Sequence, residues 1–341
     1  MSLSILHVAP FFSPKVGGVE THVAAVAAEQ VRLGNQVVVI TQAHLPGLVS
    51  EEQKNGVQIF RLPISALGKK LQTWSAIWKL RHHFLGRDRI YIHDVGWWLL
   101  PVALHLNTGF AMVFHGWEGV YPVRWQAQLH RWFLAQFAWR VIHVGSFIGR
   151  FYWDAAHAVI FGGVAQKNTK PIAKKRSKRK VKIIFIGRLE EDTAVRQYYA
   201  LAKLLRKRGV AYDLTWVGDG SLAEECAQVG TVTGFKKNVD VNLIQADVVW
   251  AASYLSILQA QAHGKLVVGL YSNPLKQEYL RSYPGAQSMI IGSNVETVAT
   301  TLQAVLKNTQ RWSQIERGAW EFARDQSWTK VATIYEAVWR K

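Results

Sequence analysis

Short apolar runs alternate along the chain with segments whose apolar residues recur every three or four positions. Ser4 to Ala9 and Gln36 to Thr41 have the length and composition of buried strands. Between them, Val19, Val23 and Val26 recur at helical spacing. Further strands are expected at residues 57–62, 90–93, 111–115 and 141–144. Strands that alternate with helices predict a parallel sheet covered on both faces.

The same alternation restarts after a basic stretch. Strands are expected at residues 181–186, 214–217, 231–233, 247–250 and 266–270, and helices at 192–208, from about 256 to 262, and from about 294 onward. We therefore expect an α/β fold with two Rossmann-like domains that face each other across a cleft. The predicted boundaries are an N-terminal domain at 1–165, a linker at 166–180, a C-terminal domain at 181–325, and a helix at 326–341 that crosses back to the N-terminal domain.

Composition narrows the class of protein. Of 341 residues, 49% are hydrophobic and 19% are charged, which is typical of a globular chain. The longest nearly apolar run, Val95 to Leu104, is too short to span a bilayer. The amino-terminal residues lack the basic segment of a secretory signal. The single cysteine, Cys226, excludes an intramolecular disulfide and a multi-cysteine metal site, and it fits a reducing, cytoplasmic location.

Half of the formal charge of +18 lies in one stretch of the chain. Nine lysines and arginines and no acidic residue lie between positions 166 and 183. Such a stretch indicates an anionic partner: a membrane surface, a nucleic acid or a phosphorylated ligand. No known nucleic-acid motif is present, so a nucleic-acid partner is the least favoured of the three.

Three loops between a strand and a helix have the chemistry to hold a phosphate. Gly17 and Gly18 precede the first helix, where exposed backbone N–H groups bind anions, although a tight turn also explains them. Arg188 follows the strand at 181–186 and can bind a diphosphate, or pair with an acid in Glu190 to Asp192. Asp219 lies in a Gly-Asp-Gly turn. No P-loop and no dinucleotide glycine motif occurs.

The order of these pieces resembles the retaining GT-B glycosyltransferases of family 4, which use nucleotide-sugar donors. The resemblance rests on PKVGGVETHV from Pro14, VFHGWEG around His115, and HVGS and VIFGGV near the end of the first domain. It continues in GRLEEDTA from Gly187, WVGDGSL, VTGF, the segment around Gln259 and the final SWTKVATIYE. It covers essentially the whole chain.

The resemblance implies a role for each matching residue. His115 and Arg188 are the expected catalytic residues, with His115 facing the donor sugar and Arg188 binding the diphosphate. The residues expected to bind the donor are Gly17, Gly18, Gly187, Thr193, Gly218, Asp219, Gly234, Phe235 and Gln259. No metal ligand and no cofactor other than the nucleotide-sugar co-substrate is expected, because no Asp-x-Asp pair or histidine cluster has ligand spacing.

The sequence departs from the family pattern in three ways. Thr193 replaces a lysine that binds the diphosphate, and Gln259 replaces the glutamate that binds the nucleotide ribose. A glutamate expected near the donor sugar has no counterpart, because residues 251–257 contain no acid. A glutamine can still hydrogen-bond ribose hydroxyls. Losing the lysine removes a charge-assisted contact worth about 1.5–3 kcal/mol.

Three residues are candidates for the acceptor side of the site. His93 and Asp94 end a strand, and Glu118 follows His115 by three positions. Glu118 has a structural alternative as an acid at a helix start. The expected catalytic His115 has one too, because a buried histidine can be satisfied by backbone groups.

Two segments combine tryptophan with basic residues. Trp125, Trp132 and Trp139 recur every seven positions. An interfacial membrane anchor is one interpretation of this stripe, and packing on its own sheet is the one we favour. Residues 69–84 hold apolar side chains among lysines, arginines and histidines, and we expect them to contact a membrane or the acceptor.

The sequence therefore predicts an enzyme that transfers a sugar from a nucleotide-sugar to a lipid-linked or glycan acceptor. It would act at the cytoplasmic membrane face, with an anionic inner leaflet as partner. The alternative is a catalytically inactive binding or partner subunit with the same fold, which the missing lysine and glutamate favour. A surface binder of membranes or nucleic acid is the third hypothesis.

Overall fold

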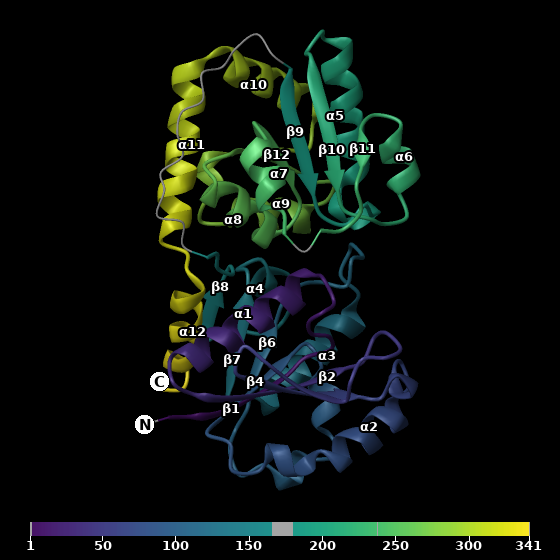
Figure 1. Ribbon diagram of the computed structural model, residues 1–341, viewed down its shortest axis with the longest axis vertical. Coiled ribbons are helices and arrows are strands. Elements are labelled where there is room, and N and C mark those ends of the chain that lie inside the picture. Colours follow the sequence, from purple (N-terminus) through teal and green to yellow (C-terminus); the bar gives the residue numbers. More distant parts are fainter. Residues whose placement is uncertain (1, 166–179, 237, 341) are drawn as a thin grey trace. The chain divides into compact units, whose positions relative to one another are not determined.

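A computed structural model describes residues 2–165, 180–236 and 238–340 (Figure 1). The chain divides into two compact units. The first comprises Met1–Glu118, Pro122–Ile160 and Trp328–Lys341, and the second comprises Gly119–Tyr121 and Phe161–Ser327. The predicted linker at 166–180 lies outside the described residues except for Lys180. No helix among the described residues is long and apolar enough to cross a membrane.

The first unit is built on a sheet of eight strands. They are β1 (Ser4–Val8), β2 (Gln36–Gln42), β3 (Glu51–Lys54), β4 (Val57–Leu62), β5 (Arg89–His93), β6 (Ala111–Phe114), β7 (Arg140–Val144) and β8 (Ala158–Ile160). Their order is β3-β4-β2-β1-β5-β6-β7-β8, and every pairing is parallel except β3 with β4. The order reverses direction between β1 and β5, and ligands bind open parallel sheets beyond such a point.

Helices cover both faces of this sheet. They are α1 (Gly18–Arg32), α2 (Lys70–Lys79), α3 (Trp125–Phe137), α4 (Ile148–Phe151) and the C-terminal α12 (Trp328–Ala337), with 3-10 turns η1 (Ile64–Ala66), η2 (Arg81–Phe84), η3 (Gly96–Leu99) and η4 (Ala103–His105). Figure 1 shows α12 beside α1, although more than 290 residues separate them. Val331 and Tyr335 of α12 join the apolar core formed by β1, β2 and α1.

The second unit contains a fully parallel sheet of six strands. They are β9 (Val181–Ile186), β10 (Tyr212–Val217), β11 (Thr231–Val232), β12 (Val248–Ala251), β13 (Leu266–Leu270) and β14 (Met289–Gly292). The order β11-β10-β9-β12-β13-β14 is that of a dinucleotide-binding Rossmann sheet. Its reversal point lies between β9 and β12, where the loop that begins at Gly187 leaves the sheet.

The helices of the second unit pack on both sides of its sheet. They are α5 (Val195–Lys207), α6 (Ala223–Ala227), α7 (Asp240–Gln245), α8 (Tyr254–Ala262), α9 (Pro274–Arg281), α10 (Val295–Lys307) and α11 (Thr309–Arg324), with 3-10 turns η5 (Glu191–Thr193) and η6 (Ala286–Ser288). Trp216 of β10 and Trp250 of β12 lie on the two strands that flank β9. Both are fully buried in the core of this unit.

The predicted strands and the α/β class are confirmed, with three differences. Strands β3, β8 and β14 are not in the prediction: β3 is polar and β8 has only three residues, whereas β14 is as long as the predicted β6 and β12. The helix predicted from Asp192 starts at Val195, because Glu191–Thr193 form a 3-10 turn and Ala194 has a positive φ of 59°. The helix predicted near Ser256 begins two residues earlier, where Ser253 caps it.

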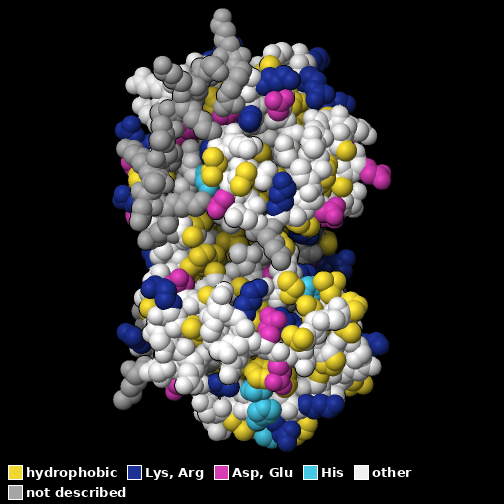
Figure 2. Space-filling view, in the orientation of Figure 1, with side chains coloured by type: hydrophobic (Ala, Val, Ile, Leu, Met, Phe, Trp, Pro, Cys, Tyr) yellow, Lys and Arg dark blue, Asp and Glu magenta, His cyan; other side chains and the backbone are white. Residues whose placement is uncertain are grey.

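The expectation that the tryptophan stripe of residues 125–139 is core is wrong. Trp125 is 60% exposed and Trp132 is 39% exposed, and Trp139 lies beyond the end of α3. The residue of α3 that is buried is Arg131. The helix therefore turns its aromatic residues toward solvent, and Figure 2 shows apolar and basic side chains interleaved on the visible face of the first unit.

The segment 69–84 divides between core and surface. Ile77 and Phe84 are buried, whereas Leu71 is 76% exposed and Trp78 also reaches the surface. Both α2 and α3 thus expose large apolar side chains on the first unit.

Candidate active site

The parallel strands at the centre of the first sheet place three of the predicted residues side by side. His93 is the last residue of β5, and His115 directly follows β6. His93 pairs in register with Val113, so His115 lies two residues further along the neighbouring strand and on the same face. Nδ1 of His93 and Nε2 of His115 are 2.8 Å apart. Asp94 follows His93 at the edge of the sheet where ligands bind.

A cavity of about 320 Å³ opens at this point in the first unit. It is lined by Val19, Asp94, Phe114, His115, Gly116, Trp117, Glu118, His130, Arg131 and Leu134. Three sequence-predicted residues, Asp94, His115 and Glu118, therefore share one cavity, with His93 buried behind them.

Glu118 is held by two partners that the sequence interpretation did not assign to the site. Its Oε1 accepts a hydrogen bond of 3.0 Å from Nη2 of Arg131, and its Oε2 accepts one of 2.5 Å from the hydroxyl of Tyr152. The Arg131 guanidinium also stacks on the Tyr152 ring at 4.0 Å. Nη1 of Arg131 is buried without a hydrogen-bond partner among the described residues. A ligand hydroxyl or anion in the cavity would satisfy that donor.

Asp94 occupies an unusual backbone position. Its φ is 60°, a left-handed conformation that aspartate adopts more readily than most residues. Its Oδ1 accepts a hydrogen bond from the backbone N–H of His115. Burial raises the pKa of Asp94 to about 6, although Arg131 and that N–H oppose the rise. Asp94 thus orients the His115 backbone and titrates near neutral pH.

The histidines of this region are neutral. Burial lowers the pKa of His115 to about 3, and the charge of Arg131 adds to this effect. Burial holds the pKa of His93 and of His22 well below its usual range. His22, from α1, contacts the His115 ring edge-on at 4.9 Å. A neutral imidazole can exchange hydrogen bonds with sugar hydroxyls but carries no charge to stabilise a leaving group.

Gly17 and Gly18 lie at the amino end of α1, as predicted. Gly17 is extended, and a Cβ placed on it would come within 2.1 Å of Oε2 of Glu20. The carboxylate of Glu20 therefore folds back against the start of the helix, where it interacts favourably with the helix dipole. A Cβ on Gly17 would make the flexible end of Glu20 shift, and this carboxylate lies at the helix end where a phosphate is expected.

In the second unit, two predicted glycines are explained by tight packing between loops. A Cβ on Gly218 would lie 1.8 Å from the backbone oxygen of Gly187, so no side chain fits there. The backbone oxygen of Asp219 accepts a hydrogen bond from the N–H of Leu189. The turn that holds Asp219 thus supports the turn that presents Arg188.

Arg188 forms an ion pair with Asp192, as one interpretation of the sequence had it. The Nη2–Oδ2 distance is 2.6 Å, and the arginine side chain is 58% exposed. The hydroxyl of Thr193 donates to the backbone oxygens of Arg188 and Glu190. Thr193 therefore shapes the loop and does not replace the cationic group of the family lysine.

Lys276 is a residue that sequence reasoning missed. It lies on α9, is buried, and donates from Nζ to the backbone oxygen of Ala252 at 2.9 Å. Ala252 follows β12, and its Cβ would touch a Cβ placed on Gly187. Burial lowers the pKa of Lys276 to about 8, while Asp192 favours and Arg188 disfavours its charged form. The loop after β9 therefore has a second cation nearby, which its sequence spacing did not reveal.

Among the described residues, no interaction joins Gly234, Phe235 or Gln259, the other residues expected to bind the donor, to the loop after β9. Gly234 has a φ of 70°, which suits glycine, and Phe235 is an exposed aromatic residue. Gln259 lies in the middle of α8 and is partly exposed.

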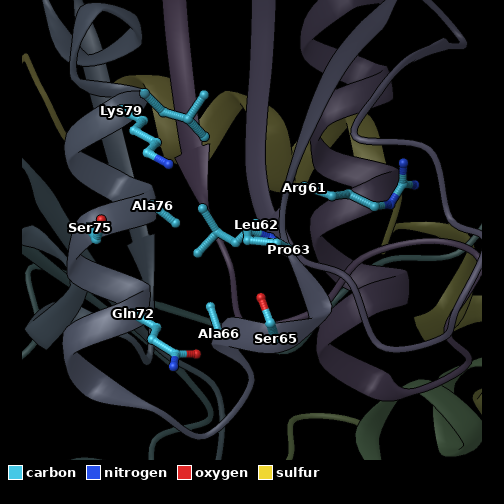
Figure 3. A pocket seen from close by; sticks show the side chains of 10 residues that line it. Arg61, Leu62, Pro63, Ser65, Ala66, Gln72, Ser75, Ala76 and Lys79 are labelled. Carbon is cyan, nitrogen blue, oxygen red and sulfur yellow. The ribbon is translucent and has the colours of Figure 1, made fainter.

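A second cavity in the first unit, of about 370 Å³, contains none of the residues predicted to be catalytic or to bind the donor or acceptor, but its helix side belongs to the segment 69–84. Figure 3 shows it between β4, η1 and α2, with Gln72, Ser75 and Lys79 on the helix side. Figure 3 also shows the Arg61 side chain extending away from α2, and its guanidinium bonds to Glu52 and to backbone oxygens. Among the described residues, no group of three acidic, histidine or cysteine side chains could hold a metal ion.

Comparison with known proteins bears on the family and the fold of the chain. Residues 17–146 match the family described as "Glycosyl transferase 4-like domain". No curated protein matches the sequence significantly.

Solved structures with the same fold cover almost the whole chain. Sucrose-phosphate synthase from Thermosynechococcus elongatus matches at 15% identity with a TM-score of 0.79, covering 99% of this chain and 98% of its own. WaaG, a glycosyltransferase involved in lipopolysaccharide biosynthesis, matches at 13% identity and 0.65, covering 98% and 99%. MurG from Acinetobacter baumannii matches at 13% identity and 0.60, covering 98% and 99%.

The resemblance inferred from the sequence is thereby confirmed. Residues 17–146 form a glycosyl transferase 4-like domain, and the complete chain has the GT-B fold of glycosyltransferases. The family match therefore covers the first part of the chain, and the likeness to solved glycosyltransferases establishes the fold of the whole.

Proposed function

We propose that the protein transfers a sugar from a nucleotide-sugar donor to a lipid-linked or glycan acceptor at the cytoplasmic face of a membrane, with retention of configuration. The observation that carries the proposal is the cavity of the first unit. It gathers His115, Asp94, Glu118 and Arg131 at the reversal point of a glycosyl transferase 4-like domain. Fold alone would not support an activity, because one fold hosts many functions.

The cavity has the chemistry of a sugar site. Neutral His115 can exchange hydrogen bonds with a hydroxyl, Glu118 can accept one, and the unpartnered Nη1 of Arg131 can donate one. Asp94 and Tyr152 hold the backbone of His115 and the carboxylate of Glu118 in place. We assign the sugar contact to His115, as the family resemblance implies.

The departing nucleoside diphosphate requires stabilisation of its negative charge, which is usually the largest electrostatic contribution in such reactions. We assign this role to Arg188, whose guanidinium is exposed, together with Lys276. Lys276 would supply the second cation that Thr193 does not. No step of this scheme uses a metal ion.

The membrane part of the proposal rests on α2 and α3. Exposed lysines, Lys70 and Lys79, accompany the exposed apolar residues of α2, and the exposed Arg124 precedes the exposed aromatic residues of α3. Helices that combine apolar and basic residues in this way bind at the interface of anionic bilayers. WaaG, which shares the fold, is a glycosyltransferase involved in lipopolysaccharide biosynthesis, and a lipid-linked or glycan acceptor is in keeping with that likeness.

Donor turnover tests the proposal. A panel of nucleotide-sugars is incubated with the protein, and release of nucleoside diphosphate is measured with and without lipid-linked or glycan acceptors. We expect at least one donor to be turned over and Arg188→Ala to reduce the rate at least a hundredfold. An unaffected Arg188→Ala variant would contradict the assignment of Arg188.

A catalytically inactive binding subunit is the second candidate. Three observations favour it: Arg188 is paired with Asp192, the Thr193 hydroxyl is bonded to the backbone, and Glu20 covers the amino end of α1. This candidate predicts no thermal stabilisation by any nucleoside diphosphate, since a ligand that binds the folded state must raise its stability.

A further inference from the structure

Three histidines form a continuous hydrogen-bonded chain in the first unit. His7 of β1 lies in register with Tyr91 of β5, two residues before His93, so His7, His93 and His115 step diagonally across three neighbouring strands. Nδ1 of His7 is 2.9 Å from Nε2 of His93, and Nδ1 of His93 is 2.8 Å from Nε2 of His115. His7 and His93 are fully buried, and His115 lines the cavity.

The series of histidines ends at the side-chain amide of Gln30, which fixes the direction in which its hydrogen bonds run. Oε1 of Gln30, from α1, lies 2.7 Å from Nε2 of His7. A carbonyl oxygen only accepts, so Nε2 of His7 carries the proton and Nδ1 of His7 is an acceptor. Because each neutral imidazole has one donor and one acceptor, His93 then donates from Nε2 to His7. By the same rule, His115 donates from Nε2 to Nδ1 of His93.

We propose that Gln30, His7 and His93 are positioning residues that fix His115 in a single neutral tautomer, with Nδ1 unprotonated as a hydrogen-bond acceptor in the cavity. Nδ1 of His115 has no hydrogen-bond partner among the described residues, so it is available to a ligand. The group that it recognises is an O–H or N–H donor. This last assignment rests on the proposed function, under which the group is a free hydroxyl of the donor sugar.

Gln30 itself indicates that the arrangement serves more than packing. The side chain is completely buried, and its Nε2 has no hydrogen-bond partner among the described residues. An unsatisfied buried amide destabilises the fold, and an apolar side chain of similar size would avoid that cost. The Oε1 bond to His7 is the side-chain contact that the glutamine supplies here.

Neighbouring aromatic residues pack against the three hydrogen-bonded histidines without bonding to the nitrogens that link them. The His7 ring stacks on the Tyr91 ring, with centroids 5.0 Å apart, and the Tyr91 hydroxyl donates to the backbone oxygen of Tyr335. His22 bonds through Nε2 to the Tyr335 hydroxyl. Tyr91 therefore offers a matched control, because Tyr91→Phe keeps the stacked ring and removes a hydroxyl that is not part of the chain.

Nitrogen-15 NMR of histidine-labelled protein without substrate tests the proposal independently of activity. The His115 signals are assigned by their loss in His115→Gln, and the couplings between ring nitrogens and carbon-bound protons identify the protonated nitrogen. At pH 7 we expect His115 to be protonated at Nε2 alone. Gln30→Met should give a mixture of tautomers at His115, and Tyr91→Phe should leave the single tautomer unchanged.

The opposite tautomer, or a mixture, at His115 in the unmodified protein would overturn the proposal. A single unchanged tautomer in Gln30→Met would also overturn it, and His7→Phe provides the same comparison if Gln30→Met does not fold. If the protein turns over a nucleotide-sugar, Gln30→Met should lower kcat by about tenfold with little change in KM. Absence of any turnover would count against the proposed function and leave the NMR result standing.

Discussion

The guanidinium of Arg188 and the carboxylate of Asp192 lie 2.6 Å apart, across one turn of the loop that follows β9. The same Asp192 favours the charged form of the buried Lys276. One acid therefore interacts with both cations that we assign to the diphosphate. In the absence of a donor, Asp192 is the counterion of both Arg188 and Lys276.

Removing the acid should strengthen anion binding. In Asp192→Asn the Arg188 side chain is free to bind phosphate, and the exposed ion pair that it gives up is worth at most about 1 kcal/mol. We expect nucleoside diphosphates to bind about two- to fivefold more tightly at pH 7, measured by titration calorimetry. Weaker binding would show that Asp192 acts on the ligand by another route.

Lys276 should contribute a charge-assisted contact. Lys276→Met should weaken binding of nucleoside diphosphate at least tenfold, since such contacts are worth about 1.5–3 kcal/mol. Lys265→Met is the matched control, because Lys265 is also buried and also bonds backbone oxygens, those of Ile244 and Ala246. Equal losses in the two variants would point to general destabilisation and contradict the assignment.

The charge of Lys276 also predicts a pH dependence of affinity. Its pKa is about 8, so the ammonium is mostly charged at pH 7 and mostly neutral at pH 9. Affinity for nucleoside diphosphate should fall as the pH rises through 8, and Lys276→Met should flatten that decrease. A decrease of the same size in the variant would place the titrating group elsewhere.

Stability should fall on acidification because buried histidines must be protonated on unfolding. Burial lowers the pKa of His7 to about 4, and that of His115 to about 3. Below pH 6.5 the unfolded chain binds more protons at these sites than the folded chain, so the free energy of unfolding decreases as pH falls. For His7 alone the loss reaches about 3 kcal/mol near pH 4. Asp94, whose pKa is raised, acts in the opposite direction between about pH 4 and 6.

Thermal denaturation between pH 7.5 and 5 measures this effect. His7→Phe should reduce the loss of Tm on acidification, whatever its Tm at neutral pH. His105→Phe, which changes an exposed histidine of the same unit, should leave the slope unchanged. An identical slope in all three proteins would contradict the neutral state of His7.

The exposed face of α3 should bind anionic lipid. Phe133 and Phe137 are exposed and contact each other with ring centroids 4.8 Å apart. Replacing both with serine should reduce binding to vesicles containing phosphatidylglycerol about tenfold or more, because each buried phenylalanine is worth about 1.5–3 kcal/mol. Val241→Ser, at an exposed apolar position of the second unit, is the control. Unchanged binding in the double variant would contradict a membrane role for α3.

The sequence predicted the parts of the fold that depend on local pattern. Strands such as β9 and β13 are continuous apolar runs, and their bounds match the prediction residue for residue. The tryptophans of α3 were misassigned because a seven-residue spacing places them on one face without saying which face meets the sheet. The buried position on that helix is taken by Arg131, whose charge Glu118 and two aromatic rings accommodate.

The candidate site was predicted only in part, because local patterns reveal strand ends but not contacts between distant elements. His93 ends β5, whereas Asp94, His115 and Glu118 come after the ends of β5 and β6, and the ends of neighbouring parallel strands meet. Lys276 and Gln30 lie on helices far from these motifs in sequence, and only packing brings Lys276 to Ala252 and Gln30 to His7. No local spacing could have revealed either contact.

A crystal structure of the protein soaked with a mixture of nucleoside diphosphates tests the central claim most directly. The account predicts a bound nucleotide whose phosphate oxygens lie within hydrogen-bond distance of Arg188 and close to Lys276. Crystals that show no nucleotide at Arg188 at millimolar concentration, from protein that also shows no thermal shift with any nucleotide, would contradict the enzymatic assignment.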